Sequence, residues 1–370
     1  MKTLQDIAER RKTLLKAYPD LAAQVAAIRA NSVKNLGQLL TRGVDTLKDK
    51  GCHVYVAENA EEARKAIKNL LSGQDRIVRT HSNTLREISF DAALVEYGIR
   101  VLNSHIGEII SEFVHREPDS FSGRHPFLPY FSLSREEATG ALRKFVNSKG
   151  DLDAQGLNDA AHRKIKEYIL ECEFGATGAN GIAAENGTLI IAEDEGNCRS
   201  VSNLPCRHLA VAGIEKMAHS VEDSLKTLQC QCVYGLGKAA PTYYSLISGP
   251  SRTGDIEFRI TFGMHGPEEV HVVILDNGRR SLVDQGLGDV LKCIDCGACF
   301  ETIASLAGRN GWEGIPLTPK SIALAIVQGK LPRPQAELSL PPFTCPVEID
   351  HLWLGRILPR IHTLSPLDAR

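Results

Sequence analysis

Three cysteines, Cys293, Cys296 and Cys299, are spaced as C-x₂-C-x₂-C in this chain of 370 residues. Thiolates at this spacing can each reach a different iron of one cubane, and Gly297 allows the tight turn that points backbone amides at the sulfurs. A bacterial ferredoxin run continues with Cys-Pro after three more residues, but this chain has Ile303 at that position. The run therefore needs a fourth ligand from elsewhere.

Cys345, which directly precedes Pro346, has the form of such a fourth ligand without a run of its own. In two-cluster ferredoxins the fourth cysteine of each run ligates the other cluster, so separation along the sequence is no obstacle. Zinc is the less favoured alternative, because structural zinc sites usually draw four cysteines as two separated pairs. We therefore predict one [4Fe–4S] cluster with four thiolate ligands: Cys293, Cys296, Cys299 and Cys345.

The other cysteines are scattered along the chain and show no ligand spacing. Isolated cysteines in a reducing compartment are mostly small buried hydrophobic residues, and we expect that here. We assign them no chemical role: Cys52, Cys172, Cys198, Cys206, Cys230 and Cys232.

The composition limits the class of protein. Lys and Arg number 43 against 45 Asp and Glu, and this net charge of −2 removes the electrostatic basis for binding nucleic acid or an anionic membrane. No apolar run approaches the roughly 20 residues that span a bilayer, and no apolar signal-peptide core follows the N-terminus. We expect a soluble, cytoplasmic, globular protein.

Alternating strand and helix patterns predict an α/β fold with a parallel or mixed sheet covered by helices. The segment 1–50 has the three- and four-residue periodicity of helices. Helices are expected at 60–71, 83–97, 154–172 and 319–328. Expected strands are 53–57, 76–80, 99–103, 188–192, 209–212 and 270–275. We divide the chain into N-terminal helices (1–50), an α/β domain (51–285) and a small C-terminal iron–sulfur appendage (286–370).

Two segments have the residue types of an anion-binding loop. Ser251, Arg252 and Thr253 follow an apolar segment, and small hydroxyls with a guanidinium at a helix N-terminus would bind a carboxylate or phosphate. A capped turn explains these three residues equally well. The second segment, 177–181, is a glycine-rich loop in which backbone approaches a ligand closely. Its candidate ligand-binding residues are Thr177, Gly178 and Asn180.

Glu185 and His81 are the candidate catalytic residues. The sequence Glu185-Asn186-Gly187 is similar to the Glu-Asn-Gly of CoA transferases, in which the glutamate is the nucleophile. We favour a simple turn at this position, with Glu185 as a solvated flank. His81 falls at a predicted strand end, as His105 and His125 fall at strand ends or loops, where a histidine general base could meet a ligand.

The segment 235–240 fits the dinucleotide-binding pattern G-x-G-x-x-A, but its surroundings do not. Pro241 follows immediately, and the preceding residues have a helical rather than a strand pattern. We therefore expect no flavin or nicotinamide site in this chain.

Long motifs in the chain resemble the lactate-utilisation (LUD) domain family. They occupy 175–189, 193–199, 208–217, 246–257 and 263–271. The resemblance implies an α/β domain similar to the ribose-phosphate isomerase and CoA-transferase group. The cysteine-bearing tail resembles that of the B-type, iron–sulfur members, which implies a role in oxidising L-lactate to pyruvate with partner subunits.

The chain departs from the B-type pattern in two places. Those proteins carry two complete cluster motifs, whereas this chain has one, and the segment that usually reads Lys-Ser-Lys-Ser is here Arg79-Thr80-His81-Ser82. We expect an electron-transfer subunit rather than a complete enzyme, acting on L-lactate or a related small hydroxy acid. The alternatives are a CoA-transferase- or isomerase-like enzyme with a structural cluster, and a cluster-carrying subunit that docks others.

Overall fold

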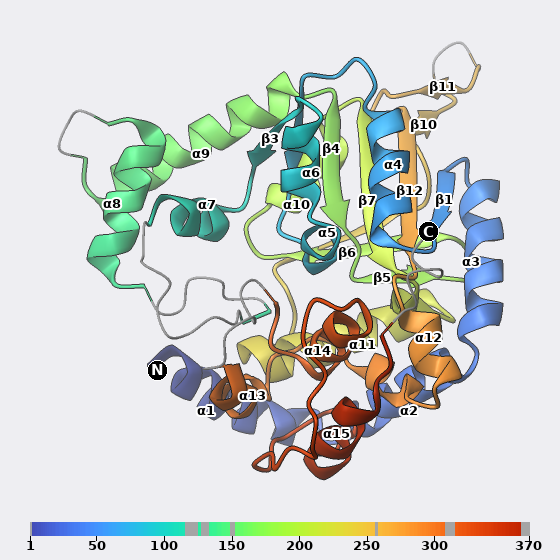
Figure 1. The fold of residues 1–370 in the computed structure, drawn as a ribbon. Helices are drawn as coiled ribbons and strands as arrows, with labels where there is room; N and C mark the ends of the chain where they lie inside the picture. The colour runs from blue at the N-terminus through green and yellow to red at the C-terminus, as the bar shows by residue number, and fades with distance from the viewer. Residues whose placement is uncertain are drawn as a thin grey trace.

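The computed structural model describes residues 2–114, 125–126, 133–148, 152–255, 258–307 and 315–363. Figure 1 shows a central sheet with helices on its faces and a further layer of helices below it. Within the described ranges, no helix has both the length and the apolar character needed to cross a membrane.

The central sheet has six strands, all paired in parallel. In spatial order they are β1 (His53–Ala57), β12 (Glu269–Leu275), β7 (Arg207–Gly213), β4 (Phe174–Gly178), β2 (Arg76–Arg79) and β3 (Arg100–Asn103). The middle strands are almost wholly buried, with β7 and β12 each exposing part of their first residue only. Burial on both faces is what a parallel sheet between helical layers requires. The predicted α/β architecture is confirmed.

Helices cover both faces of this sheet and form the layer below it (Figure 1). The N-terminal helices are α1 (Lys2–Ala17), α2 (Leu21–Lys34) and α3 (Leu36–Asp49). Those between the strands are α4 (Ala60–Leu70), α5 (Asn83–Glu87), α6 (Phe90–Glu96), α7 (Ile106–Phe113), α8 (Arg135–Val146), α9 (Ala154–Glu171), α10 (Asn197–Asn203) and α11 (Val221–Leu236). The C-terminal helices are α12 (Arg279–Asp284), α13 (Phe300–Ala307), α14 (Pro319–Val327) and α15 (His351–Ile357).

A second, four-stranded sheet has the order β8 (Met217–Ala218), β5 (Gly181–Ala183), β6 (Thr188–Glu193) and β9 (Tyr243–Ile247). It is mixed, because β5 pairs in parallel with β8 and antiparallel with β6. A third, two-stranded sheet pairs β10 (Arg252–Thr253) antiparallel with β11 (Thr261–Phe262).

Two local predictions need correction. The helix expected over 83–97 is two helices, α5 and α6, because Ser89 between them has a left-handed φ of 53°. The loop expected at 177–181 begins as β4, a strand of the central sheet. Gly175 makes β4 look like a loop in sequence, but a Cβ there would lie 2.0 Å from the carbonyl oxygen of Val201. The glycine serves close packing of α10 on the strand.

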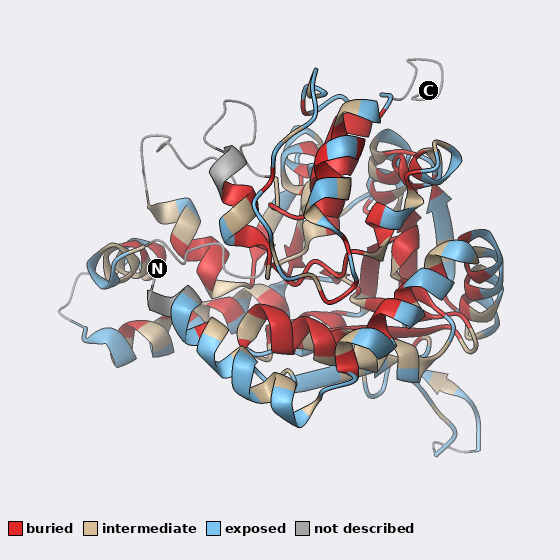
Figure 2. Ribbon diagram, turned by 90° about the horizontal axis from the view of Figure 1, so that it is seen from below, coloured by how far each residue is buried: buried red, intermediate tan, exposed pale blue. Residues whose placement is uncertain are grey.

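The hydrophobic core is continuous through the C-terminal segment. One buried cluster contains residues of α3, of strands β7 and β12, and of α13, α14 and α15. Helix α14 is buried over its entire length, apart from part of Ser321. Figure 2 shows the buried residues concentrated where the helices face the interior. The described residues after 285 therefore contribute to the same core as the α/β domain.

Candidate functional site

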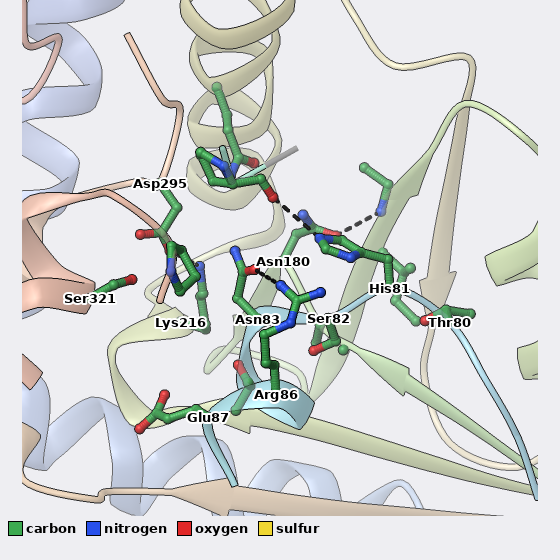
Figure 3. Close-up of a pocket in the computed structure, with 18 of the residues that line it drawn as sticks. Thr80, His81, Ser82, Asn83, Arg86, Glu87, Asn180, Lys216, Asp295 and Ser321 are labelled. Atoms are coloured by element: carbon green, nitrogen blue, oxygen red, sulfur yellow. Dashed lines mark hydrogen bonds and ion pairs between the residues drawn. The ribbon is translucent and has the colours of Figure 1, made fainter. Parts of the chain in front are cut away.

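A cavity of about 630 Å³ lies at the carboxyl ends of the central strands. The chain order of the parallel strands reverses between β2 and β4, since β2 leads outward to β3 and β4 leads the other way to β7. Open α/β sheets bind ligands in the crevice at such a reversal. Thr80 and Ser82 after β2, and Asn180 after β4, line this cavity (Figure 3). It is the candidate ligand site.

His81 is held at one wall of the cavity by two acceptors. Its Nδ1 lies 2.8 Å from the Glu108 carboxylate and its Nε2 lies 3.2 Å from the carbonyl oxygen of Pro126. The Pro126 carbonyl oxygen can only accept a hydrogen bond. Burial raises the pKa of the Glu108 carboxyl, but His81, Arg79 and Arg86 together hold this pKa well below the usual range. Both ring nitrogens of His81 therefore have partners within the protein, and neither is directed at the cavity as a free general base.

His105 is the neutral neighbour of His81, with ring centroids 5.2 Å apart. Burial and then the charge of His81 lower the pKa of His105 to about 4. Its Nδ1 accepts from the backbone N–H of Glu108, and its Nε2 lies 3.7 Å from Glu195. Burial raises the pKa of Glu195, which also lines the cavity. His105, whose pKa is lowered, thus faces Glu195, whose pKa is raised.

A buried ion network forms the opposite side of the cavity. Glu215, two residues after the end of β7, pairs with the Arg279 guanidinium and lies 2.8 Å from the Lys320 ammonium. Arg279 also pairs with Glu87 at 2.8 Å. Each of these side chains is at least five-sixths buried, so their charges interact through a medium of low polarity. The network attaches α14 to the strand ends.

Asp295 connects this network to the cysteine run, because it lies between Cys293 and Cys296 in sequence. Its Oδ2 lies 2.6 Å from Lys320 and 3.3 Å from Lys216, and all three residues line the cavity. Burial opposes its ionisation, but the two lysines lower the pKa of Asp295 to about 2. The loop of the cysteine run thus forms part of the cavity wall (Figure 3).

The structure brings the four predicted cysteine ligands together. Cys293 and Cys296 are buried in one apolar cluster with Cys345 packed against it. Burial raises the pKa of all four free thiols, and the nearby Cys345 adds to the increase at each of the other three. Two segments that are remote in sequence therefore supply sulfurs to one place.

The spacing of these sulfurs bears on what they could bind. Zinc with Zn–S bonds of about 2.3 Å needs sulfurs about 3.8 Å apart. Among the described residues, no three of the cysteine sulfurs lie within 4.8 Å of one another; His53, Glu269 and His271, at the amino ends of β1 and β12, are the group that does. No three of these sulfurs are therefore as close together as the ligands of a tetrahedral zinc site.

Backbone amides point at the sulfurs. The N–H of Asp295 lies 3.4 Å from the sulfur of Cys293, and the N–H groups of Val347 and Ile349 donate to Cys345. Asp295 and Gly297 have left-handed φ values of 55° and 77°, which fold the loop around its sulfurs. Such donors stabilise thiolates and tune the potential of a bound cluster.

The scattered cysteines are only partly as expected. Cys52, Cys172, Cys230 and Cys232 are buried, but Cys198 is half-buried at the cavity and Cys206 is exposed. Cys230 lies in the same apolar cluster as Cys293 and Cys296. It is thus a neighbour of the predicted ligands.

His125 and Pro126 make a second connection between the cysteine run and the cavity. The His125 ring lies 4.9 Å from that of Phe300, and a Cβ at Gly297 would come within 2.8 Å of its Nε2. The next residue, Pro126, accepts from His81. The His125 side chain therefore packs against the loop that carries the cysteine run.

The predicted ligand residues at 177–180 have different positions. Asn180 and Gly178 line the cavity, whereas the Thr177 hydroxyl is fully buried and lies 2.8 Å from Nε2 of His208. A Cβ at Gly178 would lie 2.5 Å from the Ser82 hydroxyl. The glycine therefore makes room for the Ser82 side chain rather than for a ligand.

The other predicted residues lie outside the cavity. Arg252 and Thr253 form a short strand, so the helix N-terminus expected beside Ser251 is wrong, and Figure 1 places this hairpin at the far end of the sheet. The Glu185 carboxylate accepts from the backbone N–H of Val221 at the start of α11, and this residue does not line the cavity. The structure brings none of these groups to the strand ends.

The charged groups at the cavity were not singled out from sequence. Glu215 and Lys216 belong to a recognised motif, 208–217, yet received no role. The sequence does carry a signal for them, because a charged pair that closely follows a buried strand lies at the carboxyl edge of the sheet. Asp295 and Lys320 gave no such signal, since only the fold brings them together.

The LUD domain model matches residues 40–275. Curated relatives include "Lactate utilization protein B" of Shouchella clausii, 28% identical over 81% of this chain and 60% of that protein. An "Uncharacterized electron transport protein YkgF" of Escherichia coli is 29% identical over 80% of this chain and 60% of that protein. "Lactate utilization protein B" of Bacillus cereus (strain AH820) is 30% identical over 74% of this chain and 55% of that protein. The chain spans about 60% of the length of the first two.

A solved structure of a DUF162 family protein from Deinococcus radiodurans is 13% identical, with a TM-score of 0.36. The superposition covers 65% of this chain and 98% of that protein.

Proposed function

Because the chain belongs to the LUD domain family, we propose that it is an iron–sulfur electron-transfer subunit of a complex that oxidises L-lactate, or a related small hydroxy acid, to pyruvate. The names of two curated relatives, one for lactate utilisation and one for electron transport, point to the same role. The observation that carries the proposal is the convergence of Cys345 with Cys293, Cys296 and Cys299.

These four residues would hold one [4Fe–4S] cluster, which supplies one-electron transfer when bound. Backbone amides directed at the sulfurs and an apolar surrounding both suit that group. Arg29 holds the preceding backbone by donating to the carbonyl oxygen of Leu291 at 2.7 Å. The chain thereby fixes the loop in place before any ligand binds.

Oxidation of a hydroxy acid releases two electrons, so each molecule would need two successive one-electron transfers through this chain. The proton and hydride chemistry would belong to a partner subunit with its own organic cofactor. The charged side of the cavity, with Lys216 and Lys320 joined to Asp295, would be where this chain senses a bound acid.

The test is to purify the chain anaerobically, together with whatever subunits accompany it, and to count iron and acid-labile sulfide. We expect about four of each per chain and an EPR signal after dithionite reduction. Addition of L-lactate to the isolated complex should produce the same signal. If dithionite reduces the cluster but neither L-lactate nor any other small 2-hydroxy acid reduces it, the assignment to lactate oxidation is contradicted.

The two alternatives have less support. A transferase would require Glu185 at a ligand site, but its carboxylate binds the first turn of α11 away from the cavity. A purely docking subunit would leave the cavity and its buried charges without a role. A chain that holds zinc, or iron that cannot be reduced, would restore the first alternative.

A further inference from the structure

Lys216 is a cavity cation with few partners of its own. Its ammonium lies 3.3 Å from Asp295, the single ion pair it makes within the described ranges. Lys320, by contrast, has close contacts of 2.6 Å to Asp295 and 2.8 Å to Glu215. An ammonium has three N–H donors. Lys216 therefore keeps more donors for the cavity than Lys320, which uses two of its three on Asp295 and Glu215.

The position of Lys216 is costly for a cation that has one ion pair only among the described residues. Burial and the charge of Lys320 lower its pKa, because both disfavour the protonated form. An anion in the cavity would remove this penalty by pairing with Lys216. Asn180 lies beside it, and since its Oδ1 accepts from the N–H of Ala192, its amide NH₂ remains to donate to the same anion.

Lys216 is also adjacent to the cysteine run. A void of about 20 Å³, enough for one water, is lined by Lys216, Cys293 and Arg29. Asp295 makes the second connection, because it contacts Lys216 through its carboxylate and Cys293 through its backbone N–H. A charge at the cysteines and a charge in the cavity would therefore act on the same lysine.

We propose that the cavity binds a carboxylate at Lys216 and that this binding is coupled to the oxidation state of the cluster through the shared contacts of Lys216 and Asp295. The proposal rests on the proposed function for the presence of the cluster. The binding site itself depends only on the cavity and its lysine.

The sign of the coupling follows from Coulomb's law. One-electron reduction adds one negative charge at the four cysteines and breaks no bond. That charge attracts Lys216 and repels an anion beside it, across a buried region of low polarity. The carboxylate should bind the oxidised chain more tightly, and by reciprocity its binding should lower the midpoint potential of the cluster.

The cavity also limits the size of the ligand. Its volume of about 630 Å³ lies in the range of about 300–1,000 Å³ typical of sites for drug-sized molecules, and lactate would fill little of it. Leu228 and Leu236 of α11 and Leu324 of α14 give it an apolar wall. The cavity therefore has room for a carboxylate whose apolar body is larger than that of lactate.

The test uses 4-phenylbutanoate as the carboxylate probe and 4-phenyl-1-butanol as its neutral counterpart. Calorimetry on the oxidised chain should show binding of the acid that Lys216→Met abolishes and Lys216→Arg retains. The neutral probe should still bind to Lys216→Met, which would show that the cavity is folded. Lys226→Met, at a surface lysine of α11, is the matched control and should bind the acid normally.

The coupling is measured by an EPR-monitored redox titration with and without the acid. A tenfold preference for the oxidised chain lowers the one-electron midpoint potential by about 59 mV. Binding with an unchanged or raised potential would overturn the coupling, and no Lys216-dependent binding would overturn the site. Lys216-dependent binding in a chain without a reducible cluster would refute the proposed function and the coupling while leaving the carboxylate site intact.

Discussion

The carboxylate of Asp295 lies 2.6 Å from the ammonium of Lys320, and this contact joins the loop of the cysteine run to α14 at the wall of the cavity. Both side chains are more than nine-tenths buried. Buried charges of this kind are tolerated only when each has its partner, and Lys320 also pairs with Glu215. The C-terminal segment is therefore held to the sheet by charge as well as by apolar packing.

Replacing this lysine should be strongly destabilising. Lys320→Met would leave Asp295 and Glu215 buried without their shared cation, at a cost of about 3–5 kcal/mol of unfolding free energy. Urea unfolding followed by circular dichroism measures the loss. Lys226→Met is the control, since this lysine pairs with exposed Glu222 and should change stability little. Equal stabilities of the two variants would contradict the role given to the buried network.

The close approach of α10 to β4 predicts that Gly175 tolerates no side chain. In Gly175→Ala the new Cβ would meet the Val201 carbonyl oxygen at 2.0 Å, so backbone must move, and we expect a loss of about 1–3 kcal/mol or more. Gly254→Ala places its Cβ in open space and serves as control. The two midpoints of thermal unfolding should differ clearly. A Gly175→Ala protein as stable as Gly254→Ala would show that the strand and helix are not packed this closely.

Buried His208 predicts a loss of stability in acid. Burial lowers its pKa from 6.5 to about 3, so between these pH values the unfolded chain binds a proton that the folded chain does not. The unfolding free energy should therefore fall with decreasing pH, by up to about 1.4 kcal/mol per pH unit from this residue. His208→Gln removes the titrating group, and its stability should decrease less between about pH 7 and about pH 5. Parallel pH profiles would refute this contribution.

Most of the central sheet could be predicted from sequence, because its strands are short apolar runs between helical patterns. Strand β4 could not, since the glycines that allow its close packing also remove its strand signal. The break at Ser89 was equally hidden, because a left-handed φ at a serine has no local sequence signature. What local pattern determines was predictable, and what tertiary packing imposes on the backbone was not.

The same division applies to the site. The cysteine ligands could be proposed from spacing alone, even though Cys345 is remote from the run. The ion network could not, because Lys320 is 25 positions from Asp295 and 105 from Glu215, and each lysine or carboxylate reads as a surface residue until the fold buries it. The anion loop at Ser251 failed for the opposite reason, since suitable residue types formed a hairpin far from the cavity.

The central claim is that two remote segments hold one cluster, and the most direct measurement is the iron content of Cys345→Ser purified anaerobically. Cys172→Ser is the matched control, because Cys172 is buried in a separate apolar cluster, whereas Cys230 lies too near the ligands to serve. We predict that Cys345→Ser loses most of its iron and its EPR signal, as Cys296→Ser should, while Cys172→Ser keeps about four irons per chain. Full retention of iron and of the signal in Cys345→Ser would contradict the account.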